Sequence, residues 1–217
     1  MRGPWKLRDD NKTLNVVVTG STGNIGKALC PILEKRGFKV FSGLSLPETI
    51  HSIIYLAGIS HVGPIETTSD TLLDEIVRVN LTGPFVLARD LSPRLTDGSS
   101  FILISSIMAT HPYPHRSLYA MTKAGLEGLT RALAVDWGER GISTYCVRLG
   151  HLDRMMRTSE PNDELLRSVR NHTPSRSLVT RGEIASFIAD LCDNRFPAMS
   201  GSVIDFDYGY CMNRYPL

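Results

Sequence analysis

Two side chains that could exchange protons stand one helical turn apart in the segment 117–126. Tyr119 and Lys123 are separated by four positions, so they share one face if this segment is helical. An ordinary tyrosine has a pKa near ~10 and is a poor acid–base catalyst at neutral pH unless a nearby cation favours its phenolate. Lys123 could supply that cation, and the tyrosine would then give or take a proton at a substrate oxygen. The alternative is that both side chains decorate a solvated helix face.

A serine that could complete this chemistry lies thirteen positions before the tyrosine. Ser106 follows the apolar run 101–104, which reads as a buried strand. Because the carboxyl ends of the strands in an open α/β sheet face the ligand crevice, we expect the Ser106 hydroxyl to donate a hydrogen bond to a substrate oxygen. Alternatively, Ser105 and Ser106 merely end the strand.

A glycine-rich turn joins the first apolar run, 16–18, to the first helical segment. A dinucleotide pyrophosphate needs backbone N–H groups aimed at it, a helix N-terminus behind them and no Cβ atoms in its way. Glycines at positions 20, 23 and 26 meet these conditions, and their place in the first strand–helix unit argues against an ordinary turn. We therefore expect a dinucleotide cofactor to bind the loop residues Gly20, Ser21, Thr22, Gly23, Asn24, Ile25 and Gly26.

The elements that must position these residues alternate between short β-branched runs and longer segments of helical period. This alternation is typical of a parallel sheet whose strands are joined by crossover helices. The sequence thus predicts an α/β protein with a doubly wound parallel sheet of six strands, in which Gly37 and Gly141 cap two helices. The predicted strands cover residues 15–19, 39–42, 52–56, 99–105, 143–148 and 202–205, and the predicted helices cover 24–36, 71–91, 119–138 and 181–191.

Length and composition indicate one domain and argue against several classes of protein. With 217 residues, 42% of them hydrophobic, the chain is long enough to bury a core without disulfides or a structural metal. No apolar run approaches the roughly 18 residues of a membrane helix. A net charge of +2 gives no argument for nucleic acid, and the charged N-terminal segment does not resemble a secretion signal. Since the four cysteines also lie far apart, we expect a cytoplasmic protein that binds neither membranes nor nucleic acid.

Together these motifs resemble the short-chain dehydrogenase/reductase family, and the resemblance covers nearly the whole chain. Residues 79–83 are similar to the family's central-helix segment, and residues 123–141 are very close to its common form. Leu56-Ala57-Gly58 resembles the end of the family's Asn-Asn-Ala-Gly strand, although Tyr55 and Leu56 stand where asparagines are usual. The resemblance implies a Rossmann-like fold and a homodimer or homotetramer.

The resemblance also implies a role for each candidate residue. Tyr119 would be the general acid or base, Lys123 would lower the pKa of Tyr119 and hold the nicotinamide ribose, and Ser106 would polarise the substrate carbonyl. Asn80 would support a proton-relay water. The cofactor would be NAD or NADP, because the segment 41–43 offers neither the acidic side chain that selects NAD nor the basic one that selects NADP. Further cofactor contacts are implied for Ser42, Ala57, Gly58 and Gly150.

The chain departs most from the family between Gly20 and Gly58, where there is no room for the usual helix–strand–helix after the second strand. Roughly ten extended residues reach about 33 Å, which is enough to cross the first strand and enter the third. Residues 45–48 could cap a single helical turn on the way. The predicted sheet then has residues 39–42 at its edge. Since the missing segment normally covers the adenine, the cofactor would be held more by its phosphates and its nicotinamide end.

The irregular stretch 151–180 occupies the place of the family's substrate lid. It lies between a cofactor-binding and catalytic core at 13–150 and a last helix and strand at 181–217. Because an arginine presents a planar fork to an anion, a carboxylate, a phosphate or a carrier-bound acyl group could dock on this lid. The alternative is a solvated loop of mixed charge. The arginines concerned are Arg154, Arg157, Arg167, Arg170 and Arg176.

Histidines give no indication of a metal site. His111 and His115 flank Tyr113 in a proline-rich loop before the predicted catalytic helix, where they are expected to line the substrate mouth. No acidic or cysteine residue stands at ligand spacing from them, so we expect no bound metal.

The sequence therefore predicts an NAD(P)-dependent oxidoreductase of the carbonyl reductase or alcohol dehydrogenase type, which transfers hydride between nicotinamide and a carbonyl or alcohol carbon. Two other interpretations stay open. A non-catalytic dinucleotide-binding or assembly protein would keep the fold, but would have no reason to retain Ser106, Tyr119 and Lys123 together. An epimerase or dehydratase would use the same tyrosine and lysine with retained NAD, but 217 residues leave no room for the larger C-terminal domain of the family's extended members.

Overall fold

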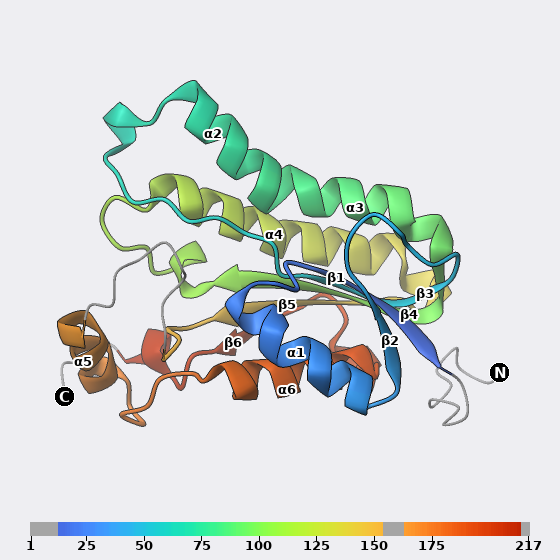
Figure 1. Cartoon of the computed structure of the whole chain (residues 1–217). Helices are drawn as coiled ribbons and strands as arrows, with labels where there is room; N and C mark the ends of the chain where they lie inside the picture. The colour runs from blue at the N-terminus through green and yellow to red at the C-terminus, as the bar shows by residue number, and fades with distance from the viewer. Residues whose placement is uncertain (1–12, 154–162, 214–217) are drawn as a thin grey trace.

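Six parallel strands form one sheet in the computed structural model, which describes residues 13–153 and 163–213 (Figure 1). The strand order is β2-β1-β3-β4-β5-β6, so the predicted six-stranded parallel sheet is confirmed. The fourth strand begins at Leu95, earlier than the sequence pattern indicates. The strands are β1 Leu14–Thr19, β2 Phe38–Phe41, β3 Ile50–Tyr55, β4 Leu95–Ser106, β5 Ser143–Leu149 and β6 Ser202–Phe206.

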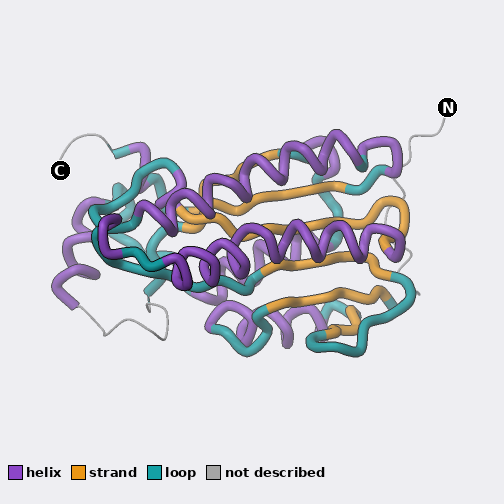
Figure 2. The backbone as a smooth tube through the Cα atoms, turned by 90° about the horizontal axis from the view of Figure 1, so that it is seen from above, coloured by secondary structure: helices purple, strands orange, loops and turns teal. Residues whose placement is uncertain are grey.

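Helices cover both faces of this sheet (Figures 1 and 2). Helices α1 (Asn24–Lys35) and α6 (Arg181–Cys192) lie on one face, and α2 (Asp70–Val77), α3 (Gly83–Leu91) and α4 (Ser117–Asp136) lie on the other. Side chains alternate along each strand, so Val16 and Val18 enter the core under α1 and α6 while Val17 enters the core under α3 and α4. Burial of each such side chain contributes roughly 1.5–3 kcal/mol. This two-sided packing explains the nearly continuous apolar runs in the strands.

The chain reverses direction across the sheet at β1. From β1 it runs through α1 to β2 at the sheet edge, and it then returns past β1 to pair β3 along the other side of β1. In an open α/β sheet, ligands bind at the carboxyl ends of the strands beside such a switch point. The crevice is therefore expected above Thr19 and Tyr55, where β1 and β3 end side by side.

The connection from β2 to β3 is short, as the sequence indicates. Strand β2 pairs only with β1 among the described strands and forms the edge of the sheet. Residues 42–49 cross to β3 without a helix, so the helical turn expected at residues 45–48 is wrong. Leu46 in this stretch is partly buried and packs against the core under α3 and α4.

The predicted helix 71–91 is interrupted. A π-helical turn at Arg78–Thr82 separates α2 from α3, and the Gly83 N–H bonds the Arg78 carbonyl five residues earlier. Tyr55 on β3 donates its hydroxyl to the Val79 carbonyl at 2.7 Å, which supplies the donor that an α-helical Gly83 would have given. A Cβ on Gly83 would lie 2.5 Å from this hydroxyl, so the glycine makes room for it.

A helix in the expected lid also departs from the prediction. Helix α5 (Asp163–His172) forms within the stretch that the sequence indicates to be irregular. It is short, strongly polar and flanked by Pro161 and Pro174, so its composition resembles a loop although Leu165, Leu166 and Val169 have helical spacing. None of the described helices is long and apolar enough to span a bilayer.

Candidate active site

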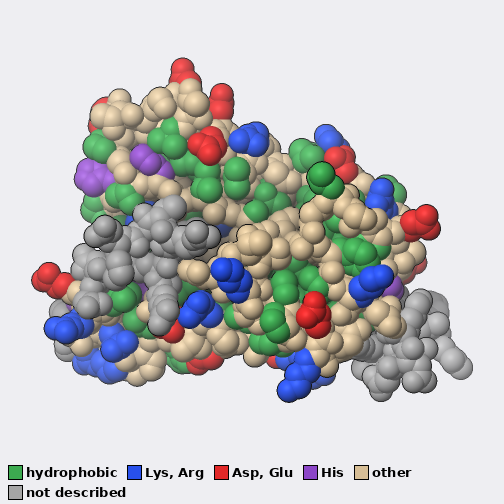
Figure 3. Space-filling model, in the orientation of Figure 1, with side chains coloured by type: hydrophobic (Ala, Val, Ile, Leu, Met, Phe, Trp, Pro, Cys, Tyr) green, Lys and Arg blue, Asp and Glu red, His purple; other side chains and the backbone are tan. Residues whose placement is uncertain are grey.

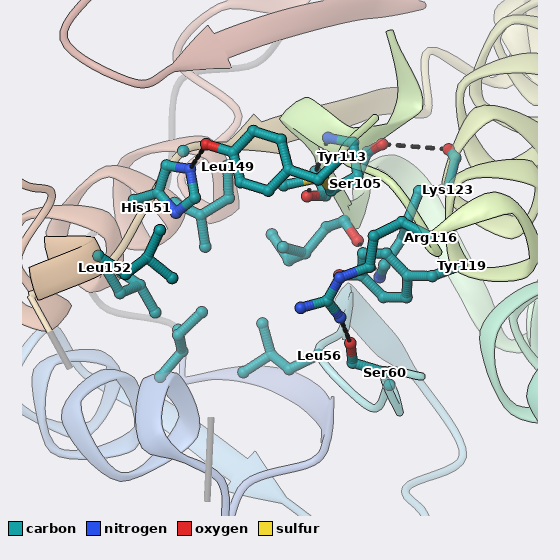
Figure 4. A pocket seen from close by; sticks show the side chains of 17 residues that line it. Leu56, Ser60, Ser105, Tyr113, Arg116, Tyr119, Lys123, Leu149, His151 and Leu152 are labelled. Carbon is teal, nitrogen blue, oxygen red and sulfur yellow. Dashed lines mark hydrogen bonds between the residues drawn. The ribbon is translucent and has the colours of Figure 1, made fainter. Parts of the chain in front are cut away.

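Two adjoining cavities open at the carboxyl edge of the sheet. One, of about 340 Å³, is lined by the glycine loop together with residues 56–60 after β3. The other, of about 210 Å³, is lined by the ends of β4 and β5 and the start of α4 (Figure 4). Ile25, Leu56, Gly58, Ser60 and Leu152 border both cavities, so the two form one continuous crevice.

Ser106, Tyr119 and Lys123 all line the smaller cavity. The Lys123 ammonium is 5.6 Å from the centroid of the Tyr119 ring, as expected for two side chains on one helix face. Lys123 is only 6% exposed, and its ammonium donates to the Ile104 carbonyl at 2.8 Å. The Ser106 hydroxyl oxygen accepts the Met108 N–H at 3.2 Å, which leaves its proton for another acceptor. The three residues thus meet in one cavity, as the spacing predicts.

Asn80 lies beneath this cavity in the π-helical turn and is 1% exposed. Its side chain forms a reciprocal pair with the backbone of Ile59, accepting from the N–H at 2.9 Å and donating to the carbonyl at 2.8 Å. It also donates to Thr122 Oγ1 at 3.2 Å. Pro84 has no N–H to bond the Asn80 carbonyl four residues earlier. The side chain of Asn80 therefore fixes the loop after β3, and its backbone carbonyl lacks the usual helical donor.

The glycine loop packs directly on the end of β3. Gly20 has φ +68°, and a Cβ there would lie 2.8 Å from the Ala57 nitrogen. A Cβ on Gly26 would lie 2.5 Å from the carbonyl oxygens of both Gly20 and Ser21. Gly23 is the N-cap of α1 and has no side chain to cap the helix, and the first residues of the helix line the larger cavity. These residues fit a pyrophosphate, which needs such N–H groups and close approach to the backbone.

Most of the predicted cofactor residues line this crevice, but two do not. Gly20, Thr22, Gly23, Asn24, Ile25, Gly26, Ala57 and Gly58 line the larger cavity, and Gly150 lines the smaller one. Ser21 lines neither cavity, and its carbonyl oxygen lies 2.5 Å from where a Cβ on Gly26 would stand. Ser42 is exposed after the end of β2 and lines neither cavity.

Those predicted docking arginines that the structure describes do not converge on the crevice either. Arg154 and Arg157 lie outside the described residues. Arg167, Arg170 and Arg176 are exposed, and Figure 3 shows basic side chains gathered at the surface where α5 lies. His111 and His115 are also exposed and line neither cavity, whereas Tyr113 between them does.

An aromatic cluster that the sequence does not reveal closes one side of the smaller cavity. The Tyr113 hydroxyl is 2.8 Å from His151 Nε2 and 2.5 Å from the Tyr210 hydroxyl, and the Tyr113 and His151 rings stack 5.6 Å apart. Burial, together with the charge of Arg116, lowers the pKa of His151 to about 4. Burial raises the pKa of Tyr113. His151 and Tyr113 are therefore uncharged at neutral pH. The three members of the cluster come from segments too distant in sequence to show a motif.

A buried ion network supports the helix that carries the tyrosine and the lysine. Glu127 on α4 receives two hydrogen bonds from the Arg148 guanidinium, at 2.9 and 2.8 Å, and Arg148 also bonds Asp205 on β6 at 2.6 Å. The Glu127 carboxylate raises the pKa of Arg148 further above its ordinary value. Ser105 donates to both Glu127 and the Lys123 carbonyl. The network fixes α4 against β4, β5 and β6, and so fixes where Lys123 lies.

Comparisons with known proteins agree with this geometry. Residues 45–211 match the sequence model of a family described as "Enoyl-(Acyl carrier protein) reductase". The chain is 33% identical over 160 residues to an uncharacterized oxidoreductase of Thermotoga maritima, an alignment that takes in 70% of this chain and only 64% of the relative. It is 25% identical over 232 residues to the 3-oxoacyl-[acyl-carrier-protein] reductase FabG of Rickettsia bellii, with 90% and 96% covered.

The fold is also that of a solved short-chain dehydrogenase/reductase from Serratia marcescens. The two superpose with a TM-score of 0.80 over 93% of this chain and 99% of that one, at 21% identity. The FabG alignment spans 232 positions but takes in only 90% of a 217-residue chain, so it contains gaps on this side, as expected for a chain with an internal deletion. With the family model matched over residues 45–211, the chain belongs to the short-chain dehydrogenase/reductase family.

Proposed function

We propose that this protein is an NAD(P)-dependent oxidoreductase that transfers hydride between nicotinamide and a carbonyl or alcohol carbon. The observation that carries the proposal is that Ser106, Tyr119 and Lys123 line one cavity, and that this cavity continues into the crevice under the glycine loop. The coenzyme, when bound, supplies or accepts the hydride. The side chains of the smaller cavity act on the substrate oxygen.

Negative charge builds on that oxygen as hydride reaches the carbonyl carbon. Tyr119 gives its proton to the oxygen in reduction and takes it back in oxidation, and Ser106 donates a hydrogen bond from its free hydroxyl proton. The Lys123 ammonium, held by the Ile104 carbonyl, stabilises the phenolate that Tyr119 leaves. The Asn80 carbonyl, which cannot accept an α-helical hydrogen bond from Pro84, would hold a water of the proton path.

The glycine loop and the residues after β3 would hold the coenzyme. The Gly23 N–H donates to the Gly20 carbonyl at 2.9 Å and closes the loop, so backbone N–H groups at the start of α1 would bind the pyrophosphate. A Cβ on Gly58 would lie 3.5 Å from Lys123 Nζ. Lys123 would also bond the nicotinamide ribose. Because Ser42 is exposed and lines neither cavity, we propose no preference between NAD and NADP.

The segment 151–180 would act as the substrate lid. Leu152 and Leu165 from this segment line the smaller cavity, although its exposed arginines do not. We also propose a homodimer or homotetramer, because the outer side of α2, α3 and α4 exposes Leu73, Phe85 and Met121. Light scattering on the purified chain measures this directly.

The function is tested by replacing the hydroxyl that moves the proton. Binding of NADH and NADPH is followed by fluorescence, and turnover is then measured over a panel of ketones and alcohols. Tyr119→Phe should bind coenzyme normally and lose about 100-fold or more in kcat. Tyr208→Phe, which changes an exposed tyrosine, is the matched control and should keep its activity.

Three results would contradict the proposal. Full turnover by Tyr119→Phe would exclude the proton-transfer role. Tight coenzyme binding with no turnover of any carbonyl or alcohol would favour a non-catalytic binding protein. Tightly retained NAD with epimerisation or dehydration of a substrate would favour the third interpretation.

A further inference from the structure

Arg116 extends into the smaller cavity beside the candidate catalytic residues. It is the N-cap of α4, three positions before Tyr119, and its side chain lines the cavity with Ser106, Tyr119 and Lys123. Figure 4 shows the guanidinium reaching into the hollow between Tyr119 and Ser60. Its sequence position gives no hint of this placement, because Arg116 stands in an irregular loop among exposed residues.

Among the residues that the structure describes, the partners of this guanidinium are uncharged. One nitrogen donates to Ser60 Oγ at 2.6 Å and to the His61 carbonyl at 3.3 Å. Within the described part of the chain no carboxylate forms an ion pair with Arg116. At least one carboxylate pairs with each of Arg36, Arg89, Arg140, Arg148 and Arg195. Nε and the second terminal nitrogen have no acceptor among the described residues. Arg116 is half-buried, so its charge is partly desolvated without a counter-charge.

The rest of the cavity adds positive charge and apolar surface. Lys123 is a second cation, and no aspartate or glutamate is found among the described lining residues. The charge of Arg116 acts across the cavity on His151. Burial and this charge together lower the pKa of His151 to about 4. Apolar side chains form most of the remaining wall, among them Leu56, Met108 and Leu149. A ligand that suits this cavity has an anionic group and an apolar body.

Resting on the proposed function, we propose that the substrate is a small oxo or hydroxy acid whose free carboxylate is bound by the Arg116 guanidinium. The carbonyl or alcohol oxygen then lies at Ser106 and Tyr119, and the apolar body lies against Leu56, Met108 and Leu149. A planar guanidinium with two free donor positions matches a carboxylate in a way that an ammonium does not. The neutral carbonyl of an acyl thioester would leave this cation unpaired.

The anion at Arg116 belongs to the substrate and not to the coenzyme. Arg116 lines the cavity of Ser106 and Tyr119 and is absent from the lining of the cavity under the glycine loop, where the coenzyme phosphates would lie. A free carboxylate and a coenzyme phosphate share the same guanidinium chemistry, so the experiment measures both.

The test compares an acid with its neutral ester. The probes are 3-oxohexanoate and methyl 3-oxohexanoate, which differ in the charge of one group, and the readout is the ratio of their kcat/KM values. In Arg116→Gln this ratio should fall about 30-fold relative to the native protein, the range expected for one charge-assisted pair. Arg116→Lys keeps the charge but loses the planar guanidinium, so the ratio should fall less in this variant than in Arg116→Gln. Arg167→Gln, an exposed arginine on α5, should keep the native ratio.

A binding measurement keeps the inference separate from the proposed function. Butyrate, an unreactive carboxylate, is titrated by calorimetry into the protein with and without NADPH, and its Kd should rise about 30-fold in Arg116→Gln. If no carbonyl is reduced but butyrate binding still depends on Arg116, the proposed function fails and the carboxylate site stands. An unchanged acid-to-ester ratio and an unchanged butyrate Kd in Arg116→Gln would overturn the site. A higher NADPH Kd with an unchanged acid-to-ester ratio in Arg116→Gln would instead mean that Arg116 binds the coenzyme. A lower acid-to-ester ratio in Arg167→Gln would mean that the lid binds the substrate carboxylate.

Discussion

Acid should destabilise this protein through one buried histidine in the wall of the smaller cavity. His151 has a pKa of about 4 in the folded chain against an ordinary value of 6.5, because burial and the Arg116 charge both disfavour its charged form. When the pKa of a group is lower in the folded chain, the unfolded chain takes up the proton at a higher pH than the folded chain does. The stability that His151 contributes is therefore complete above pH 6.5 and is lost as the pH falls toward 4.

The size of the effect follows from these two pKa values. At pH 5 the histidine of the unfolded chain is almost fully protonated, while that of the folded chain is mostly neutral. Linkage then makes the free energy of unfolding about 2 kcal/mol smaller at pH 5 than at pH 7 through this group alone. Protonation would also place a cation beside Arg116, so activity should fall over the same range.

Urea unfolding at pH 7 and pH 5, followed by tryptophan fluorescence, measures the loss. Comparison of the native protein with His151→Gln isolates the histidine, since every other titrating group is common to both. His151→Gln should show about 2 kcal/mol less acid destabilisation than the native protein, whatever its stability at pH 7. His111→Gln, which changes an exposed histidine, should lose as much stability between pH 7 and pH 5 as the native protein does.

An equal loss of stability in the native protein and in His151→Gln would refute this reasoning. It would mean that His151 is protonated in the folded chain as easily as in the unfolded one. The Tyr113–His151–Tyr210 cluster would then be open to water, and the closed wall described for the cavity would be wrong.

Two further substitutions test the loops that shape the crevice. Tyr55→Phe removes the donor to a carbonyl in the π-helical turn and should lower the free energy of unfolding by about 1–2 kcal/mol and also lower kcat, which urea unfolding and steady-state kinetics measure. Gly20→Ala should weaken coenzyme binding, because the added Cβ would lie 2.8 Å from the Ala57 nitrogen and because the backbone there has a φ of +68°. Gly98→Ala has a similar φ, +80°, and open space around its Cβ position, so it should cost only about 1 kcal/mol of stability and leave the coenzyme Kd unchanged.

The order of the helices and strands and the central residues of the site could be predicted, because short stretches of sequence determine them. The period of the strands, the glycine loop and the Tyr119–Lys123 spacing each act within about ten residues, and each appears in the structure where the sequence indicates it. The edge position of β2 also follows, since eight connecting residues cannot hold a crossover helix.

The features that could not be predicted depend on contacts between distant segments. The π-helical turn is stabilised by Tyr55, 24 positions from the carbonyl it bonds, at a place where the resemblance only indicates an unusual residue. Arg116 enters the cavity because Ser60, 56 positions earlier, holds its guanidinium. Ser42 follows β2 at the position where the resemblance implies a cofactor contact. In the structure its side chain is exposed and lines neither cavity.

The place of the deletion explains why the chain can lose an element and keep the site. Toward their carboxyl ends the central strands keep a regular register, with Val18 opposite Ile54, Ile54 opposite Ile102 and Ile102 opposite Tyr145. The register shift between β3 and β4 lies at the start of β3, between Ile50 and Ser52. Ser106 ends β4 inside this block, whereas β2 lies at the sheet edge and contributes no residue to the lining of either cavity. Loss of material beyond β2 therefore leaves the geometry around Tyr119 intact and removes only contacts at the far end of the crevice. On the proposed function, the recognition of coenzyme falls on the pyrophosphate and nicotinamide ends, where Gly23, Gly58 and Lys123 lie.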